Sequence, residues 1–134
     1  LSYFSEQART FGITYTVSAS IPKHISISET DLSILFGNLL ENAIDACNAQ
    51  SGEDKKIIVR AKTDNHSLCV TIDNTFSGSL DINQEGHFVS SKHEGLGLGT
   101  ESIKSIAEKY GGVCQFEANN GMFYASVMCF KDHV

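Results

Sequence analysis

Alternating apolar and polar positions along the chain predict a set of β-strands. Near the N-terminus, Ile13, Tyr15 and Val17 alternate with threonine and serine, which is the two-residue period of a half-buried strand. The predicted strands span Ile13–Ile21, Lys56–Thr63, Ser67–Asn74, Val113–Ala118 and Met122–Phe130. Turn residues at 64–66 and 119–121 predict two hairpins. The last strand is apolar on both faces, so we expect it inside the sheet or beneath the N-terminal helix.

Apolar residues spaced three and four positions apart predict helices between these strands. The predicted helices span Ser2–Thr10, a stretch from Ser28 to about Ala49, and Thr100–Tyr110. The first ends at Gly12, and the second begins at a capping box formed by Ser28 and Asp31.

The second helix carries an unusual polar face, on which Asn38, Asn42 and Asp45 stack. The opposite, apolar side comprises Leu32, Phe36, Leu39, Leu40, Ala43, Ala46 and Cys47. Asparagine and aspartate are poor helix formers because their side chains compete for backbone hydrogen bonds. Their oxygens are ligands that Mg²⁺ accepts, and amides can also donate to phosphate. On this helix alone, a ligand site and a solvated surface are equally good interpretations.

The third predicted strand ends in a polar residue on its apolar face. Leu68, Val70 and Ile72 point inward, and the same parity places Asn74 inward and Asp73 on the opposite face. A polar side chain at the inward end of a strand needs a hydrogen-bond partner. That partner is either a ligand or the backbone of an Asx-turn, and the spacing alone favours the turn.

A stretch without clear periodicity, Thr75–Glu94, follows this strand and leads into Gly95, Gly97 and Gly99. Such a stretch of roughly twenty residues indicates either disorder or a functional loop. Glycines at a helix N-terminus let backbone N–H groups approach an anion, which the helix dipole also attracts. The spacing matches neither a P-loop nor a dinucleotide-binding fingerprint.

Composition and charge narrow the range of partners. The chain has 134 residues and a net charge of −6 without a basic run, which argues against nucleic acid or an anionic membrane surface. This length suits one domain with one core. We find neither a membrane-spanning segment nor a signal peptide, and the missing initial Met indicates an excised fragment. The four cysteines lack metal-binding spacing, so we expect reduced, buried thiols and a cytoplasmic setting.

The helix asparagines, the inward polar strand end and the glycines occur in an order that resembles the ATP-binding domain of the GHKL superfamily. This group includes gyrase, a heat-shock chaperone, mismatch-repair ATPases and sensor histidine kinases. The resemblance extends from Ile13 to Phe130 and is strongest at 38–46, 95–99 and 110–112. It implies an α/β (α+β) two-layer sandwich of the Bergerat type, with a mixed, mainly antiparallel sheet and helices on one face.

The resemblance also implies a domain division and a role for the helix asparagines. Residues 1–12 would end a linker helix from an upstream domain, and 13–134 would form the ATP-binding catalytic domain. Asn42 matches the family's Mg²⁺-coordinating asparagine, and Asn38 would help to hold the metal or the phosphates. Hydrolysing branches have a glutamate general base at the position of Asn38. Because asparagine cannot take that proton, a kinase fits better than an ATPase.

The family's adenine-binding box, D-x-G-x-G, is altered in this chain. Asn74 stands where the family has the Asp that receives the adenine amino group, and Asp73 is the alternative if the register shifts by one residue. Phe76 replaces the first glycine, whereas Gly78 keeps the second. An asparagine carbonyl can still accept a hydrogen bond from the adenine amine, without charge assistance.

The loop Thr75–Glu94 would be the ATP lid of such a domain. Lys92 is either the cation that reaches the phosphates or an ordinary solvated lysine. The triphosphate would bind the backbone amides of Gly95, Leu96, Gly97, Leu98 and Gly99. Two positions depart from the family. Asp45 replaces the Lys or Arg of many sensor kinases, and Met122 replaces a common Thr or Ser.

The implied function is to bind Mg²⁺ and ATP and to transfer the γ-phosphate to a histidine on a separate dimerisation domain of the same, membrane-anchored kinase. A response regulator would act downstream, and this fragment would not contact the membrane directly. None of the five histidines lies in a phosphoacceptor-like helix, so the fragment alone is not expected to phosphorylate itself. The segment 42–46 and the Asn-type box are reminiscent of peptide-sensing quorum kinases of Gram-positive bacteria. A GHKL serine kinase acting on a regulatory partner and a non-catalytic nucleotide-binding or structural module are the alternatives.

Overall fold

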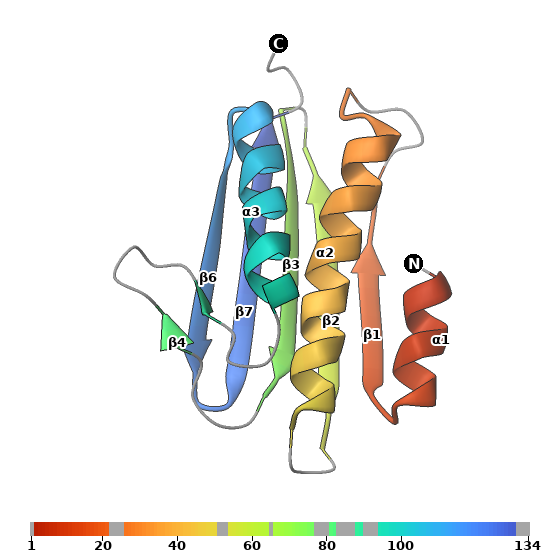
Figure 1. Cartoon of the computed structure of the whole chain (residues 1–134). Coiled ribbons are helices and arrows are strands. Elements are labelled where there is room, and N and C mark those ends of the chain that lie inside the picture. Colours follow the sequence, from red (N-terminus) through yellow and green to blue (C-terminus); the bar gives the residue numbers. More distant parts are fainter. Residues whose placement is uncertain are drawn as a thin grey trace.

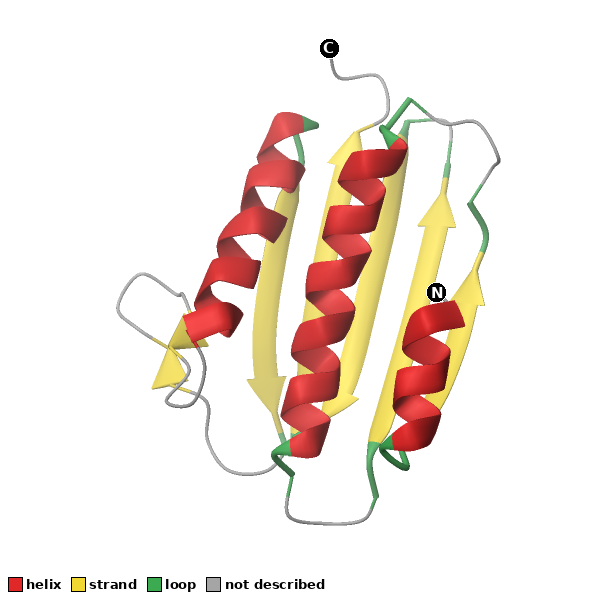
Figure 2. Cartoon of the chain, turned by 45° about the vertical axis from the view of Figure 1, so that its right-hand side comes forward, coloured by secondary structure: helices red, strands yellow, loops and turns green. Residues whose placement is uncertain are grey.

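The computed structural model shows helices packed on one face of a twisted sheet (Figures 1 and 2). It describes residues 2–21, 26–50, 54–64, 66–76, 81–82, 88–89 and 94–130. The described helices α1, α2 and α3 all lie on the same side of the sheet, as the turned view in Figure 2 makes clear. The other face of the sheet carries no helix among the described residues.

The main sheet has five strands in the order β1-β2-β3-β7-β6. The strands are β1 (Thr14–Ala19), β2 (Lys56–Thr63), β3 (Ser67–Thr75), β6 (Val113–Asn119) and β7 (Met122–Phe130). The β1–β2 pair is parallel and the three other pairs are antiparallel. The predicted mixed, mainly antiparallel sheet with helices on one face is therefore confirmed.

Both predicted hairpins are confirmed, and so is the interior position of the last strand. Asp64 Oδ1 accepts hydrogen bonds from the backbone N–H groups of His66 and Ser67, which closes the β2–β3 turn. Asn120 and Gly121 have positive φ angles of 52° and 79°, as a two-residue hairpin turn requires. The β7 strand lies between β3 and β6 rather than beneath α1.

The helices are α1 (Ser2–Thr10), α2 (Glu29–Asn48) and α3 (Glu94–Lys109). The predicted cap of α2 is confirmed, because Ser28 Oγ accepts from the backbone N–H of Asp31 at 3.0 Å. Gly12 has a φ of 70°, and the Ile13 N–H bonds to the Ala8 carbonyl at 2.8 Å, which ends α1.

The prediction that the third helix begins at Thr100 was wrong, because α3 begins at Glu94 and includes the glycines at 95, 97 and 99. Once a helix is nucleated, adding a residue fixes few dihedrals for each new hydrogen bond. A glycine then costs only about 1 kcal/mol relative to alanine, which the packed helix can bear.

One hydrophobic core fills the space between the helices and the sheet. Inward residues of β2, β3 and β7 are buried, as the alternation predicts. In α2 the buried stripe includes Leu35 and Ile44, which lie beside the predicted one, whereas the predicted Leu32, Phe36 and Ala46 are only half-buried. The edge strand β1 is less covered than predicted, and Val17 is exposed because β1 has a neighbour on one side only.

A cluster of polar side chains ties the start of α2 to the end of α3. The Asp31 carboxylate accepts hydrogen bonds from Lys109 Nζ at 2.8 Å and from the buried Tyr110 hydroxyl. The same hydroxyl accepts from the backbone N–H of Ser28 at 3.2 Å. The Lys109 ammonium, followed by the Tyr110 hydroxyl, lowers the pKa of Asp31 below its ordinary value.

Acid is expected to weaken the fold through Asp31. Because its pKa is lower in the folded than in the unfolded chain, its contribution is present above about pH 4 and is lost as the pH falls through the folded-state pKa. Asp31→Asn should lower the free energy of unfolding at pH 7 by on the order of 1 kcal/mol, and by less at pH 3. Urea unfolding at both values measures this, with the exposed Asp45→Asn as control. An equal loss at both pH values would contradict the role of the Asp31 charge.

The four cysteines are free in the structure. Cys47 and Cys129 are buried, whereas Cys69 and Cys114 are partly buried. Burial raises the pKa of the Cys129 thiol to about 11, so it stays protonated. Among the described helices, none is long and apolar enough to cross a membrane.

Candidate functional site

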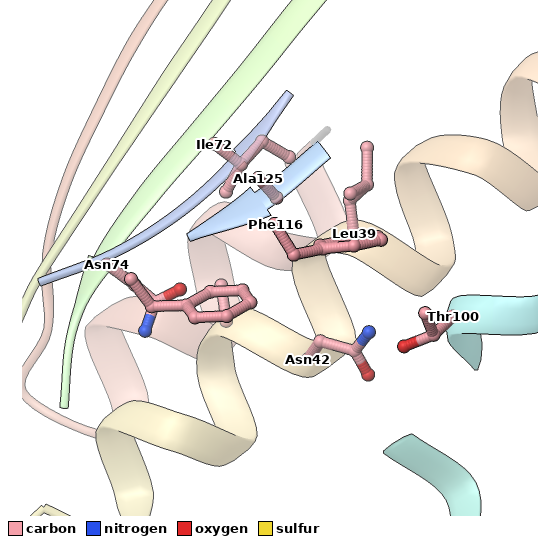
Figure 3. A pocket seen from close by; sticks show the side chains of 9 residues that line it. Leu39, Asn42, Ile72, Asn74, Thr100, Phe116 and Ala125 are labelled. Carbon is pink, nitrogen blue, oxygen red and sulfur yellow. The ribbon is translucent and has the colours of Figure 1, made fainter. Parts of the chain in front are cut away.

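A hollow opens between α2, α3 and the strands β3, β6 and β7 (Figure 3). Its enclosed part is small, about 10 Å³, and it opens to solvent. Its lining comprises Leu39, Asn42, Ala43, Ile72, Asn74, Thr100, Phe116, Phe123 and Ala125. The hollow is therefore apolar, with three polar side chains contributed by three different elements.

Asn42 and Asn74 meet at this hollow from α2 and β3, and Figure 3 shows both among its lining side chains. Asn74 is 1% exposed, although it is polar. Its Nδ2 donates to the backbone carbonyl of Thr75 at 2.9 Å. The inward parity predicted for Asn74 is confirmed. Its contact with adenine stays a prediction.

Asp73, the alternative to Asn74, points away from the hollow. It lies on the opposite face of the sheet, where its Oδ2 accepts from Arg60 Nη1 at 3.0 Å. The β2–β3 register pairs Asn74 with the buried Ile57 and Asp73 with the half-buried Ile58. In this register, Asn74 is the residue of the two that can meet a ligand in the hollow.

Asn38 is half-buried on α2, but it does not line the hollow. It precedes Asn42 by four residues, so the helix turns its side chain by about 40° relative to that of Asn42. Asp45, the third polar residue of the predicted face, is exposed. The structure therefore brings Asn42, but neither Asn38 nor Asp45, to the lining.

Two aromatic side chains that sequence analysis did not single out form one wall of the hollow. The rings of Phe116 on β6 and Phe123 on β7 stack with centroids 6.2 Å apart and planes at 19°. The register pairs Phe116 with Ala125 and Ala118 with Phe123, so the phenylalanines are diagonal neighbours on one face. The alternation of the sequence could show that both side chains point inward, but it could not show which side chains they would contact.

Thr100 is the third polar side chain of the hollow, and it too was missed. It is buried on α3, directly after the segment Gly95–Gly99 that forms the first part of this helix. The first backbone N–H groups of a helix lack intrahelical partners and favour anions. The glycine segment is helical, and it ends next to Thr100 at the edge of the hollow.

Gly78 and Lys92 lie outside the described residues. Within the predicted lid, the structure describes the short strands β4 (Asp81–Ile82) and β5 (Phe88–Val89), which pair antiparallel. The β5 strand lies against α3. A role of this segment as a lid stays a prediction.

The residues of the hollow fit an adenine nucleotide in their chemistry. Flat aromatic rings and aliphatic side chains suit a planar base, and the buried Asn74 amide offers it a hydrogen bond. The Asn42 carboxamide offers an oxygen of the kind that Mg²⁺ accepts. Among the described residues, those that line the hollow include no carboxylate.

Comparisons with known proteins show the family to which this chain belongs. A family model described as "GHKL domain" matches residues 27–129. A probable C4-dicarboxylate sensor kinase of Bacillus subtilis (strain 168) is 26% identical over 104 residues, which cover 75% of this chain and 19% of the relative. The C4-dicarboxylate transport sensor protein DctB of Rhizobium meliloti (strain 1021) is 36% identical over 84 residues, with coverage of 60% and 13%. The chain thus spans less than a fifth of the length of either relative.

Solved structures share the fold. The nucleotide-free catalytic domain of the histidine kinase ThkA has a TM-score of 0.75 at 22% identity, covering 97% of this chain and 86% of that chain. ThkA in complex with the response regulator protein TrrA gives 0.71 at 22% identity, with coverage of 97% and 37%. The predicted resemblance is confirmed: the chain belongs to the GHKL domain family and has the fold of histidine kinase catalytic domains.

Proposed function

We propose that this domain binds ATP with Mg²⁺ in the hollow and presents the γ-phosphate to a histidine on a separate domain of a two-component sensor kinase. The observation that carries this proposal is the buried Asn74 amide, set among apolar and aromatic side chains in the hollow that Asn42 also lines (Figure 3). The Nδ2 of Asn74 is paired with the Thr75 carbonyl, so its Oδ1 is the atom left to accept a hydrogen bond from a ligand.

The chemistry of the lining favours transfer of the phosphoryl group over hydrolysis. Hydrolysis requires a general base that takes a proton from water. The described lining offers two amides and a hydroxyl, and no group that can act as such a base near pH 7. Bound Mg²⁺ would supply charge neutralisation for the transferring phosphate. The chain's own part is then to bind the base and to hold the metal through Asn42 with help from Asn38. The triphosphate would be positioned by Lys92 and by the amides at the start of α3, at 95–97, because the amides of Leu98 and Gly99 are bonded within the helix.

The partners follow from the same proposal. The acceptor would be the histidine of a dimerisation domain in the same protein. A response regulator would act downstream of it. The names of the relatives, a probable sensor kinase and a transport sensor protein, support these partners, and so does the ThkA complex with the response regulator TrrA. We propose a cytoplasmic position for this domain, in a kinase that is anchored to the membrane. The suggested relation to quorum kinases stays a prediction.

Calorimetric titration with a non-hydrolysable ATP analogue, with and without Mg²⁺, tests the binding step. Binding that strengthens with Mg²⁺ is expected. No binding at millimolar nucleotide would refute the proposal. Transfer of the labelled γ-phosphate from ATP to an added acceptor then distinguishes a histidine kinase from a serine kinase. Transfer to a serine-bearing partner but not to a histidine domain would favour the GHKL serine kinase.

Asn74→Ala is expected to weaken ATP binding about tenfold while leaving its Mg²⁺ dependence intact. The substitution removes the hydrogen bond to the base and leaves the phosphate and metal contacts in place. The same titrations measure this, with Asp73→Ala, on the opposite face of the sheet, as the matched control. An unchanged preference for ATP over GTP in Asn74→Ala would overturn the assignment of Asn74 to the base.

A further inference from the structure

The Asn74 carboxamide has one orientation in the structure, and the backbone fixes it. Its Nδ2 lies 2.9 Å from the carbonyl oxygen of Thr75. A carbonyl oxygen can only accept a hydrogen bond, so the NH₂ group and not the oxygen must face it. Turning the amide over would bring two acceptors together. Asn74 therefore offers the hollow its Oδ1, to which no described residue donates a hydrogen bond.

The Thr75 carbonyl is itself held by groups from the adjoining elements. The β2–β3 register ends at the Ile57–Asn74 pair, and beyond it the backbone N–H of Lys56 donates to Thr75 Oγ1 at 3.0 Å. The Cys47 thiol at the end of α2 lies 3.6 Å from the Thr75 carbonyl oxygen and 3.7 Å from Thr75 Oγ1. Thr75 is thus fixed from β2 and from α2 together.

Toward the Thr75 carbonyl oxygen, the Cys47 thiol can serve only as a donor, whereas toward Thr75 Oγ1 either group can donate. Cys47 is fully buried, and this burial raises the pKa of its thiol, so the sulfur keeps its proton. A carbonyl oxygen has two lone pairs, enough to accept from both Asn74 Nδ2 and the thiol. The arrangement leaves the Asn74 oxygen as the group that a ligand meets.

We propose that the Thr75 carbonyl, as a positioning group, orients Asn74 so that the site selects purines with an amino group at C6 and rejects purines with an oxygen there. This inference rests on the proposed function and adds a reason for its base specificity. An asparagine that could turn freely would accept from an amino group or donate to an oxygen equally well. With Nδ2 bound to Thr75, it can only accept, so a 6-oxo group would face a like acceptor and leave a buried group unpaired.

Titration calorimetry with ATP, purine riboside triphosphate and ITP, all with Mg²⁺, tests the proposal. These nucleotides carry an amino group, a hydrogen and an oxygen at C6. We expect ATP to bind about tenfold more tightly than the analogue with hydrogen, and ITP to bind most weakly. ITP binding as tightly as purine riboside triphosphate would overturn this inference and leave the proposed function standing. Absence of binding by all three would overturn both.

Hydrogen exchange of the Asn74 side chain in the free protein provides a second readout that needs no nucleotide. The hydrogen bond to Thr75 should slow exchange of one Nδ2 proton relative to the exposed Asn48, which lies on the surface of α2. The Asn74 signals are assigned by their loss in Asn74→Asp. Exchange of both Nδ2 protons as fast as those of Asn48 would contradict the fixed orientation.

Discussion

We expect Gly112→Ala to destabilise the folded domain by about 3 kcal/mol or more. Gly112 lies between the end of α3 and the start of β6, next to the backbone of β7 at Met128. A Cβ atom at this position would lie 1.7 Å from the Met128 carbonyl oxygen and 2.7 Å from its carbonyl carbon. Because the obstacle is the backbone of a paired strand, no change of rotamer relieves the clash. Unfolding followed by circular dichroism should show a melting temperature lower by roughly 10 °C.

Gly37→Ala is the matched control for this substitution. Gly37 lies within α2, and a Cβ atom there would have no neighbouring atom within 4 Å. Alanine should therefore stabilise the helix by about 0.5–1 kcal/mol, because it restricts the unfolded chain more than glycine does. Similar effects of the two substitutions would contradict the close approach at Gly112.

Local patterns were sufficient for most elements of this fold. The cap at Ser28 placed the start of α2, and the Asn120-Gly121 turn placed the last hairpin. Two-residue parity put Asn74 on the inner face of β3. These features depend on residues close together in the sequence, so the sequence contains their cause. The start of α3 was not predictable in this way, because the segment 95–99 is helical despite the low helix propensity of its glycines.

The composition of the site was harder to predict, because it depends on which strands become neighbours. Phe116 and Phe123 meet Asn42 only because β7 and β6 follow β3 in the sheet. No local pattern encodes that order. Asn38 and Asn42 lie on the same side of α2, as predicted. They are nevertheless about 40° apart around the helix and about 6 Å apart along it, so only Asn42 lines the hollow. Helix periodicity and strand parity singled out Asn42 and Asn74, and the resemblance to a family supplied their roles, whereas Thr100 and the phenylalanines required the structure.

The clearest functional test of the site is Asn42→Ala, which should abolish the strengthening of ATP binding by Mg²⁺. Asn42 contributes its carboxamide to the hollow from the middle of α2, and alanine keeps the helix while removing the candidate metal ligand. Loss of groups that only orient metal ligands costs about 10- to 100-fold in metal affinity, so loss of a ligand should cost at least tenfold.

Calorimetric titration of Asn42→Ala with the ATP analogue should therefore give the same weak affinity in Mg²⁺ and in EDTA, whereas the unmodified domain binds more tightly in Mg²⁺. Asn48→Ala, an equal change at an exposed position of the same helix, should behave like the unmodified domain. A thermal unfolding curve of each variant separates loss of binding from loss of fold. If Asn42→Ala retained the full Mg²⁺ effect, the metal would have to be held elsewhere, and Asn38, one turn earlier on α2, would be the next residue to replace.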